Sequence, residues 1–200
     1  MSLHGKAISV NSHQYINQTS GKQEWRTPTF ILQSARKTLG WIDLDPASSI
    51  SAQKYVKAHN YYTIEDDGLK QQWSGRVWMN HPFGRKENPL WTGKLIDDYE
   101  AGFIHSALCI TYAATSESWF QCLMHYPQCY LAPRTNYIDM ATGEPVKGVP
   151  KGSAVTYLGD WPQAFYYHFS DHGTIMWPGT HVPVWFRTLN RKRLGMNEDE

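Results

Sequence analysis

The sequence predicts an α/β domain in which helices flank a mainly parallel central sheet. Short apolar runs alternate along the chain with segments of helical periodicity, which is typical of strands joined by helical crossovers. The chain has 200 residues, 41% hydrophobic and 14% aromatic, which is enough for a sizeable core and excludes a wholly disordered protein. Two predicted strands end in unusual polar loops, and ligands of parallel sheets lie beyond the carboxyl ends of the strands.

The first half of the chain alternates between helix and strand. Apolar spacing predicts a helix over 29–39, which begins after a proline and ends at Gly40. The apolar run 41–44 predicts a buried strand that an Asp-Pro pair terminates. Serines then offer N-caps for a helix within 48–58, and residues 76–79 predict the second clear strand.

The second half continues the alternation. Residues 90–101 favour a helix, and 104–112 form the strongest remaining strand signal. The other expected elements are a helix over 118–124 and extended segments over 128–132 and 153–158. The aromatic residues of 165–169 and 177–185 are expected to pack in the core.

Composition divides the chain into three parts. Residues 1–24 are rich in Ser, Asn, Gln, Gly and His and are expected to form a flexible N-terminal arm. Residues 25–176 carry the predicted helices and strands and form the main domain. Residues 177–200 form a C-terminal extension with a basic run at 187–193 and an acidic tail at 197–200.

Charge and composition exclude several classes of protein. A net charge of +1 excludes a strongly basic nucleic-acid coat but leaves room for a local basic patch. No apolar run approaches the ~20 residues of a membrane helix, and the polar N-terminal residues lack the apolar core of a signal peptide. The three cysteines form no CxxC pair and the nine histidines no HExxH pattern. We therefore expect a cytoplasmic protein with reduced thiols, no membrane segment and no metal.

The tetrad Asn80-His81-Pro82-Phe83 suits methyl transfer to an exocyclic amino group. Such an amine is a poor nucleophile, because its lone pair is delocalised into the ring. The side-chain carbonyl of Asn80 and the backbone carbonyl of His81 can accept its two N–H bonds and favour a tetrahedral nitrogen. Pro82 stiffens the turn, and Phe83 can stack on a planar base. On the tetrad alone, a plain strand-to-turn junction with a hydrogen-bonded loop histidine explains these residues equally well.

Further motifs surround the tetrad in a fixed order. They are Thr27-Pro28, Leu44-Asp45-Pro46-Ala47-Ser48, Asp67-Gly68-Leu69 with Trp73, the segment 75–84, Trp119-Phe120, Arg134, Ser153-Ala154-Val155 and the segment 169–175. Together they resemble the phage-type DNA N6-adenine methyltransferases, the small Dam-like enzymes of phages and prophages, over about residues 25–176. The resemblance implies a Rossmann-like class I methyltransferase fold. His81 departs from the family's usual Asn-Pro-Pro-Tyr or Asn-Pro-Pro-Phe tetrad but keeps the backbone carbonyl.

The resemblance also implies S-adenosylmethionine as the methyl donor. Asp45 follows a strand and could approach the donor's amino group or ribose. Asp67 could accept a hydrogen bond from the donor's adenine or ribose, although Asp66-Asp67-Gly68 is also an ordinary turn signal. The expected donor-binding residues are Thr27, Pro28, Asp45, Pro46, Ala47, Ser48 and Asp67.

An enzyme that methylates adenine in double-stranded DNA must flip the base out and hold the surrounding phosphates. Arg85 and Lys86 directly follow the tetrad, and Arg134 and Lys151 flank a Gly- and Pro-rich segment. We expect these four side chains to contact DNA. The basic run 187–193 could contact DNA as well, although such runs are more often solvated. The resemblance also implies a monomer or weak dimer in the cytoplasm of a bacterial cell that hosts a phage or prophage. The implied biological role is connected with restriction and modification.

Three functions are compatible with these residues. The first is adenine N6 methylation in DNA by base flipping. The second is methylation of another amine by the same fold, since Asn-x-Pro-Phe and Asn-x-Pro-Tyr tetrads also serve enzymes that act on guanine amines of RNA or glutamine amides of proteins. The third is a catalytically decayed protein that still binds the donor or DNA, which His81 in the tetrad suggests.

Overall fold

The computed structural model describes residues 25–139, 141–146, 151–179 and 182–195. The expected N-terminal arm and the acidic tail lie outside these residues.

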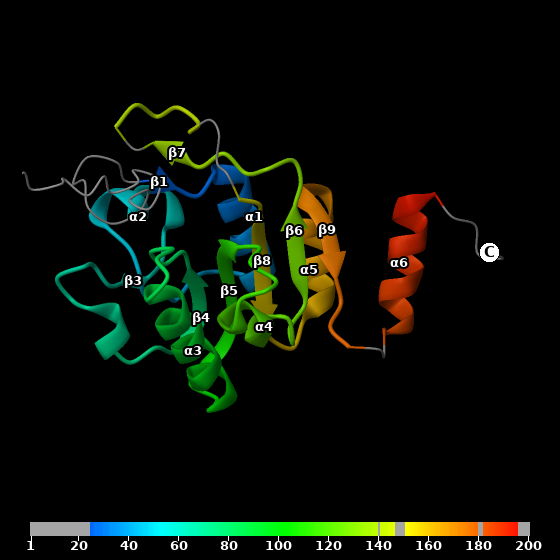
Figure 1. The fold of residues 1–200 in the computed structure, drawn as a ribbon, viewed down its shortest axis with the longest axis horizontal. Coiled ribbons are helices and arrows are strands. Elements are labelled where there is room, and N and C mark those ends of the chain that lie inside the picture. Colours follow the sequence, from blue (N-terminus) through cyan, green and yellow to red (C-terminus); the bar gives the residue numbers. More distant parts are fainter. Residues whose placement is uncertain (1–24, 140, 147–150, 180–181, 196–200) are drawn as a thin grey trace, which may run out of the picture.

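A seven-stranded sheet forms the centre of the molecule (Figure 1). The strand order is β3-β2-β4-β5-β8-β6-β9. Strands β3, β2, β4 and β5 run parallel, whereas β8 pairs antiparallel with both β5 and β6, and β6 pairs antiparallel with β9. In this order the strands are β3 (Asn60–Tyr61), β2 (Leu44–Asp45), β4 (Gly75–Met79), β5 (Ile104–Tyr112), β8 (Ser153–Leu158), β6 (Gln128–Leu131) and β9 (Gly173–Met176).

The prediction of a mainly parallel sheet is therefore wrong for one half of the sheet. Parallel neighbours need a crossover, usually a helix, whereas antiparallel neighbours do not. Between β6 and β8 the described chain contains only the short strand β7 (Ile138–Asp139), and the two strands pair antiparallel. The fold is a mixed α/β architecture with a parallel half and an antiparallel half.

Helices cover both faces of the sheet (Figure 1). The helices α1 (Thr29–Leu39), α2 (Ile50–Val56) and α5 (Pro162–Phe169) contribute to one core, and α3 (Glu87–Glu100) and α4 (Ser118–Leu123) to the other. Side chains of β4 alternate between the two cores, with Trp78 in the first and Val77 and Met79 in the second. This alternation shows that β4 is buried on both faces of the sheet.

Several predicted helix ends are confirmed. Helix α1 spans the expected residues, with Pro28 as N-cap and Gly40 at φ 83° as C-cap. Helix α2 begins after Ser49, whose hydroxyl accepts a hydrogen bond of 3.2 Å from the backbone nitrogen of Ala52. Helix α3 begins at Glu87, earlier than expected, because a proline in the first helical turn removes no hydrogen bond.

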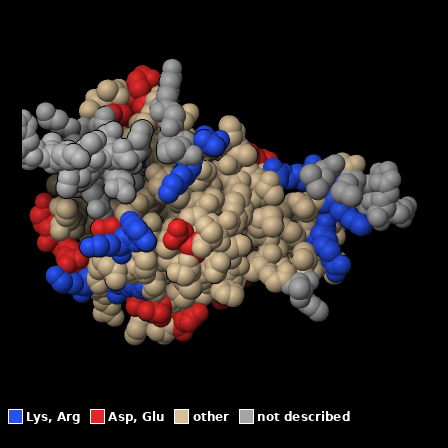
Figure 2. All heavy atoms as spheres, viewed as in Figure 1, with Lys and Arg blue, Asp and Glu red and all other residues tan. Residues whose placement is uncertain are grey.

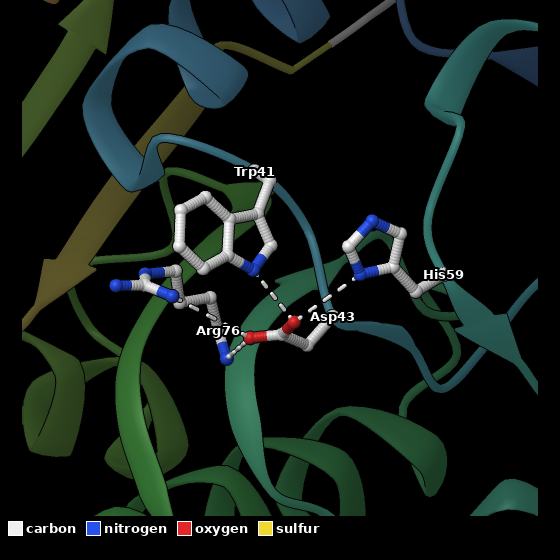
Figure 3. A network of polar contacts seen from close by, with 4 residues as sticks. All are labelled: Trp41, Asp43, His59 and Arg76. Carbon is white, nitrogen blue, oxygen red and sulfur yellow. Dashed lines mark hydrogen bonds and ion pairs between the residues drawn. The ribbon is translucent and has the colours of Figure 1, made fainter.

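The predicted strand 41–44 is shorter than expected, because Asp43 is the centre of a polar network (Figure 3). Its carboxylate accepts hydrogen bonds from the indole nitrogen of Trp41 at 2.7 Å and the backbone nitrogen of Arg76 at 2.8 Å. His59 Nδ1 lies 3.4 Å from the same carboxylate, and the guanidinium of Arg76 lies over the Trp41 ring. A Cβ on Gly75 would lie 2.7 Å from Asp43 Oδ2, so only glycine fits there. The network joins the amino ends of β2 and β4.

Several elements had no clear signal in the sequence. Strand β1 (Trp25–Arg26) pairs antiparallel with β7 and forms a separate small sheet. A last helix, α6 (Val184–Leu194), follows β9. The short 3-10 helices η2 (Gly68–Lys70) and η3 (Ser170–His172) complete the described elements. The expected core packing is confirmed for Phe165 and Phe169, which are fully buried, and is wrong for Tyr167, which is exposed.

The three cysteines are all free and differ in exposure. Cys109 and Cys129 are buried in the sheet, and burial raises the pKa of each thiol to about 12. Cys122 lies exposed on α4. In the described segments, we find no helix long and apolar enough to cross a membrane and no His, Cys, Asp and Glu cluster that could hold a metal ion.

Candidate active site

A cavity of about 740 Å³ lies beyond the carboxyl ends of β2, β4 and β5. Its walls come from β1, the loop after β2, helix α2, the tetrad and the end of β5. Many of the residues expected from the sequence line it: Thr27, Asp45, Ala47, Ser48, Asn80, His81, Pro82 and Phe83. The parallel half of the sheet therefore gathers two strand-end loops at one cavity, as expected for parallel strands.

Asn80 is oriented by a residue that lies far from it in the sequence. Its side-chain nitrogen donates a hydrogen bond of 3.1 Å to Thr27 Oγ1. Thr27 is buried just ahead of α1. Because this bond uses the amide nitrogen, the carbonyl oxygen of Asn80 is the group left to accept a hydrogen bond from a ligand.

His81 is held in a fixed orientation within the tetrad. Its Nε2 lies 2.9 Å from Asn88 Oδ1, and its ring stacks on Trp91 with centroids 6.1 Å apart. Both His81 and Asn88 are buried. Because an amide oxygen only accepts hydrogen bonds, Nε2 of His81 carries the proton in its bond to Asn88 Oδ1. Burial lowers the pKa of His81 to about 4, and the ring is therefore neutral at pH 7. The hydrogen-bonded loop histidine considered for this position is confirmed.

Aromatic side chains form one wall of the cavity. Phe83 packs against Tyr112 with ring centroids 4.6 Å apart and against Tyr137 at 6.1 Å. Tyr137 is buried, and its hydroxyl lies 3.2 Å from Ser153 Oγ. Flat rings around an open space suit a planar aromatic ligand.

Asp45 is the buried charge of the cavity. Gln53 Nε2 donates to its Oδ2 at 2.9 Å, and the backbone nitrogen of Ala47 donates to Oδ1 at 3.4 Å. Gln53 also donates to Ser48 Oγ at 2.7 Å, so one side chain joins two expected site residues. Burial raises the pKa of Asp45 to about 7, against the opposing effect of these hydrogen bonds. A ligand that donates hydrogen bonds to Asp45 would stabilise the ionised form.

The other expected donor-binding residues do not line the cavity. Pro28 precedes α1, and its carbonyl accepts a hydrogen bond from Ile31. Pro46 is in close contact with Gly68, because a Cβ on Gly68 would collide with the carbonyl oxygen of Pro46. Asp67 forms an ion pair of 2.7 Å with Lys70 at the start of η2. From the same loop, residues 63–65 line the cavity and Asp67 does not.

The cations expected to contact DNA lie outside the cavity. Arg85 and Lys86 are exposed between the tetrad and α3, and Arg134 is exposed after β6. Lys151 Nζ lies 5.4 Å from the ring centroid of Tyr112, which places it beside the aromatic wall.

The sequence patterns missed several residues that line the cavity. Tyr112 is the last residue of the predicted strand 104–112, and the end of a parallel strand is where a ligand-binding residue is expected. Trp25, Arg26 and Tyr137 come from the small β1–β7 region, which has no periodicity to reveal it. Arg26 also lies over the ring of Tyr55 on α2, at 3.9 Å from its centroid.

A comparison with known protein families finds a match over most of the chain. The family model described as DNA N-6-adenine-methyltransferase (Dam) matches residues 16–173, a range that contains every residue lining the cavity. No curated protein matches the chain.

Proposed function

The chain belongs to the DNA N-6-adenine-methyltransferase (Dam) family, and from this premise we infer that it methylates adenine N6 in double-stranded DNA with S-adenosylmethionine as donor and a flipped base as acceptor. The observation that carries this proposal is the content of one cavity. The Asn80 amide, an aromatic wall and a buried carboxylate all line it.

The donor fits the part of the cavity around Asp45. A volume of about 740 Å³ lies within the usual range of ligand sites. Asp45 is a buried acceptor for the hydroxyl or ammonium groups of the donor, and Ala47 and Ser48 leave its surroundings open to a close approach. When bound, the donor supplies an electrophilic methyl group. We propose that the parallel half of the sheet is the Rossmann-like, donor-binding half.

The adenine fits the part of the cavity around the tetrad. The carbonyl oxygen of Asn80 and the backbone carbonyl of His81 would accept the two N6 hydrogens, which directs the nitrogen lone pair toward the methyl group. Phe83, with Tyr112 and Tyr137 beside it, would hold the base by stacking. In-line alignment of this kind is worth about 7–11 kcal/mol of the barrier.

No strong base is required in this arrangement. The methylated amine loses its proton after transfer, and neutral His81 directs its Nε2 proton to Asn88 rather than to the substrate. We propose that Arg85, Lys86, Arg134 and Lys151 contact phosphates around the flipped base.

Methyl transfer from labelled S-adenosylmethionine to unmethylated genomic DNA tests the proposal. Mass spectrometry of the nucleosides should identify N6-methyldeoxyadenosine as the product. RNA and protein fractions in parallel reactions test the alternative acceptors. Label in either of these fractions, with none in DNA, would contradict the proposal, and so would donor binding without transfer to any acceptor.

Replacing His81 with Pro restores the family's usual tetrad, and we expect two opposite effects. Methyl transfer should be kept or should rise, because the backbone carbonyl remains. The free energy of unfolding should fall by about 1–3 kcal/mol, because the buried Asn88 oxygen loses its donor. Denaturant titration and initial rates measure the two effects. His81→Gln is the matched control, since its amide can still donate to Asn88. Lost transfer in a Pro variant that is still folded at the assay temperature would show that the imidazole takes part in the reaction.

A further inference from the structure

Helix α6 carries a dense positive charge and lies outside the family match. It contains Arg187, Arg191, Lys192 and Arg193 and no acidic residue. All four cations are exposed, and no Asp or Glu of the described residues forms an ion pair with them. The family match ends at residue 173, so this helix lies outside the matched range.

The helix is anchored, which distinguishes it from a solvated basic tail. Phe186 is buried, with its ring 5.4 Å from that of Tyr166 on α5 and 5.5 Å from that of Trp177. Trp185 packs edge-on against the same two partners. The aromatic residues lie near the amino end of α6, so packing against α5 fixes where the basic residues stand.

Helix stability does not account for all of this charge. Cations in the last turn, such as Arg191 and Arg193, favourably complement the helix dipole. Arg187 lies in the first turn, where a cation is unfavourable. It is also one turn from Arg191, so the two like charges share a face and repel each other. An anionic partner would offset both effects.

The position of α6 suits a long anionic partner that also reaches the cavity. In Figure 1 the carboxyl end of α6 points toward the same edge of the molecule as β1 and α2, which line the cavity. Figure 2 shows Lys and Arg side chains gathered at the end of the molecule where α6 lies. Strands β8, β6 and β9 lie between β5 and the side of the molecule where α6 lies (Figure 1).

We propose that α6 binds the DNA backbone on one side of the target adenine, outside the catalytic domain. This inference rests on the proposed function, because the partner is the same DNA duplex. The helix would add affinity and no sequence specificity, as contacts to phosphates do. It would act on a flank of the target site, whereas Arg85, Lys86, Arg134 and Lys151 would act around the flipped base.

The test compares two fourfold variants. One replaces Arg187, Arg191, Lys192 and Arg193 with Gln. The matched control is Arg187→Lys, Arg191→Lys, Lys192→Arg and Arg193→Lys, which keeps the charge. Binding to a duplex of about 40 base pairs is measured by fluorescence anisotropy over a series of salt concentrations, since each phosphate contact contributes about 0.9 to the slope of log affinity against log salt.

We expect the Gln variant to have a slope shallower by about 2 or more and a DNA affinity at least about 10-fold lower at low salt. The charge-retaining control should match the wild type. For the Gln variant, kcat at saturating DNA and donor affinity should be unchanged, while KM for DNA rises. Should the fourfold variant fail to bind donor, Arg187→Gln with Arg191→Gln carries the test, with about half the change in slope.

An unchanged slope in the folded Gln variant would overturn the inference, and so would an equal loss in the charge-retaining control. Failure of the proposed function would look different, because the wild-type enzyme itself would then transfer no methyl group to DNA.

Discussion

Replacing Asn80 with Ala should lower the rate of methyl transfer to DNA by about a thousandfold, the upper range for removing one hydrogen-bonding group from a transition state. The acceptor oxygen of Asn80 is most valuable while the amine becomes tetrahedral, so its loss should act on kcat. Donor affinity should stay within about twofold of the wild type. Asn80 follows β4 and is only partly buried, so the variant should fold. Single-turnover kinetics and calorimetric donor titration measure the two quantities.

Thr27→Val is the matched control for Asn80→Ala. It removes the hydroxyl that binds the Asn80 nitrogen but keeps the acceptor oxygen. If Asn80 acts on the substrate, the Thr27 variant should lose less activity than Asn80→Ala. Wild-type activity in Asn80→Ala would remove the residue from the reaction.

Replacing Asp45 with Asn should weaken donor binding by about 10- to 100-fold, because hydrogen bonds to a charged acceptor are worth about 1.5–3 kcal/mol. The same variant should make the ligand-free protein more stable at pH 8. The carboxylate is buried, and its ionised form is unfavourable until a ligand donates to it. Donor titration and thermal unfolding should therefore move in opposite directions.

The pH dependence of stability tests the same assignment. Between pH 3.8 and about 7, folded Asp45 holds a proton that the unfolded chain has released, so stability falls as pH rises. His81 acts in the opposite sense. Between pH 6.5 and about 4, the unfolded chain takes up a proton that the buried imidazole does not, so stability falls as pH falls.

In the wild type these two effects oppose each other from about pH 4 to pH 6.5. Asp45→Asn removes the Asp45 effect, so only the His81 effect remains. The melting temperature of the variant should therefore rise more steeply with pH over that window than that of the wild type. The Asn variant is also its own structural control, since its side-chain oxygen can still accept the bond from Gln53. Parallel pH profiles for the variant and the wild type would contradict the raised pKa of Asp45.

The parallel half of the fold was predictable because it is encoded locally. Helix 29–39, the cap at Ser49 and the strand before Asn80 each have a signal within a few residues. The rule that parallel strands end at one edge then places Asp45 and Asn80 at one cavity without any further information.

The rest of the site depends on contacts between distant segments. Tyr137 reaches the cavity beside a two-residue ladder between β1 and β7, which is too short for a hydrophobic pattern. Gln53 is directed to Asp45 by the position of α2 rather than by its neighbours in the sequence. Asp67 lies within an ordinary turn signal, and its carboxylate pairs with exposed Lys70 rather than facing the cavity.

The unequal burial of the three cysteines also makes the protein selective toward thiol reagents. Cys109 and Cys129 are enclosed and protonated at neutral pH, whereas Cys122 stands exposed on α4, away from the residues that line the cavity. A maleimide fluorophore would therefore attach at one defined position of the natural sequence. Helix α4 thus provides an optical reference point on the enzyme from which distances to a labelled duplex can be followed in solution.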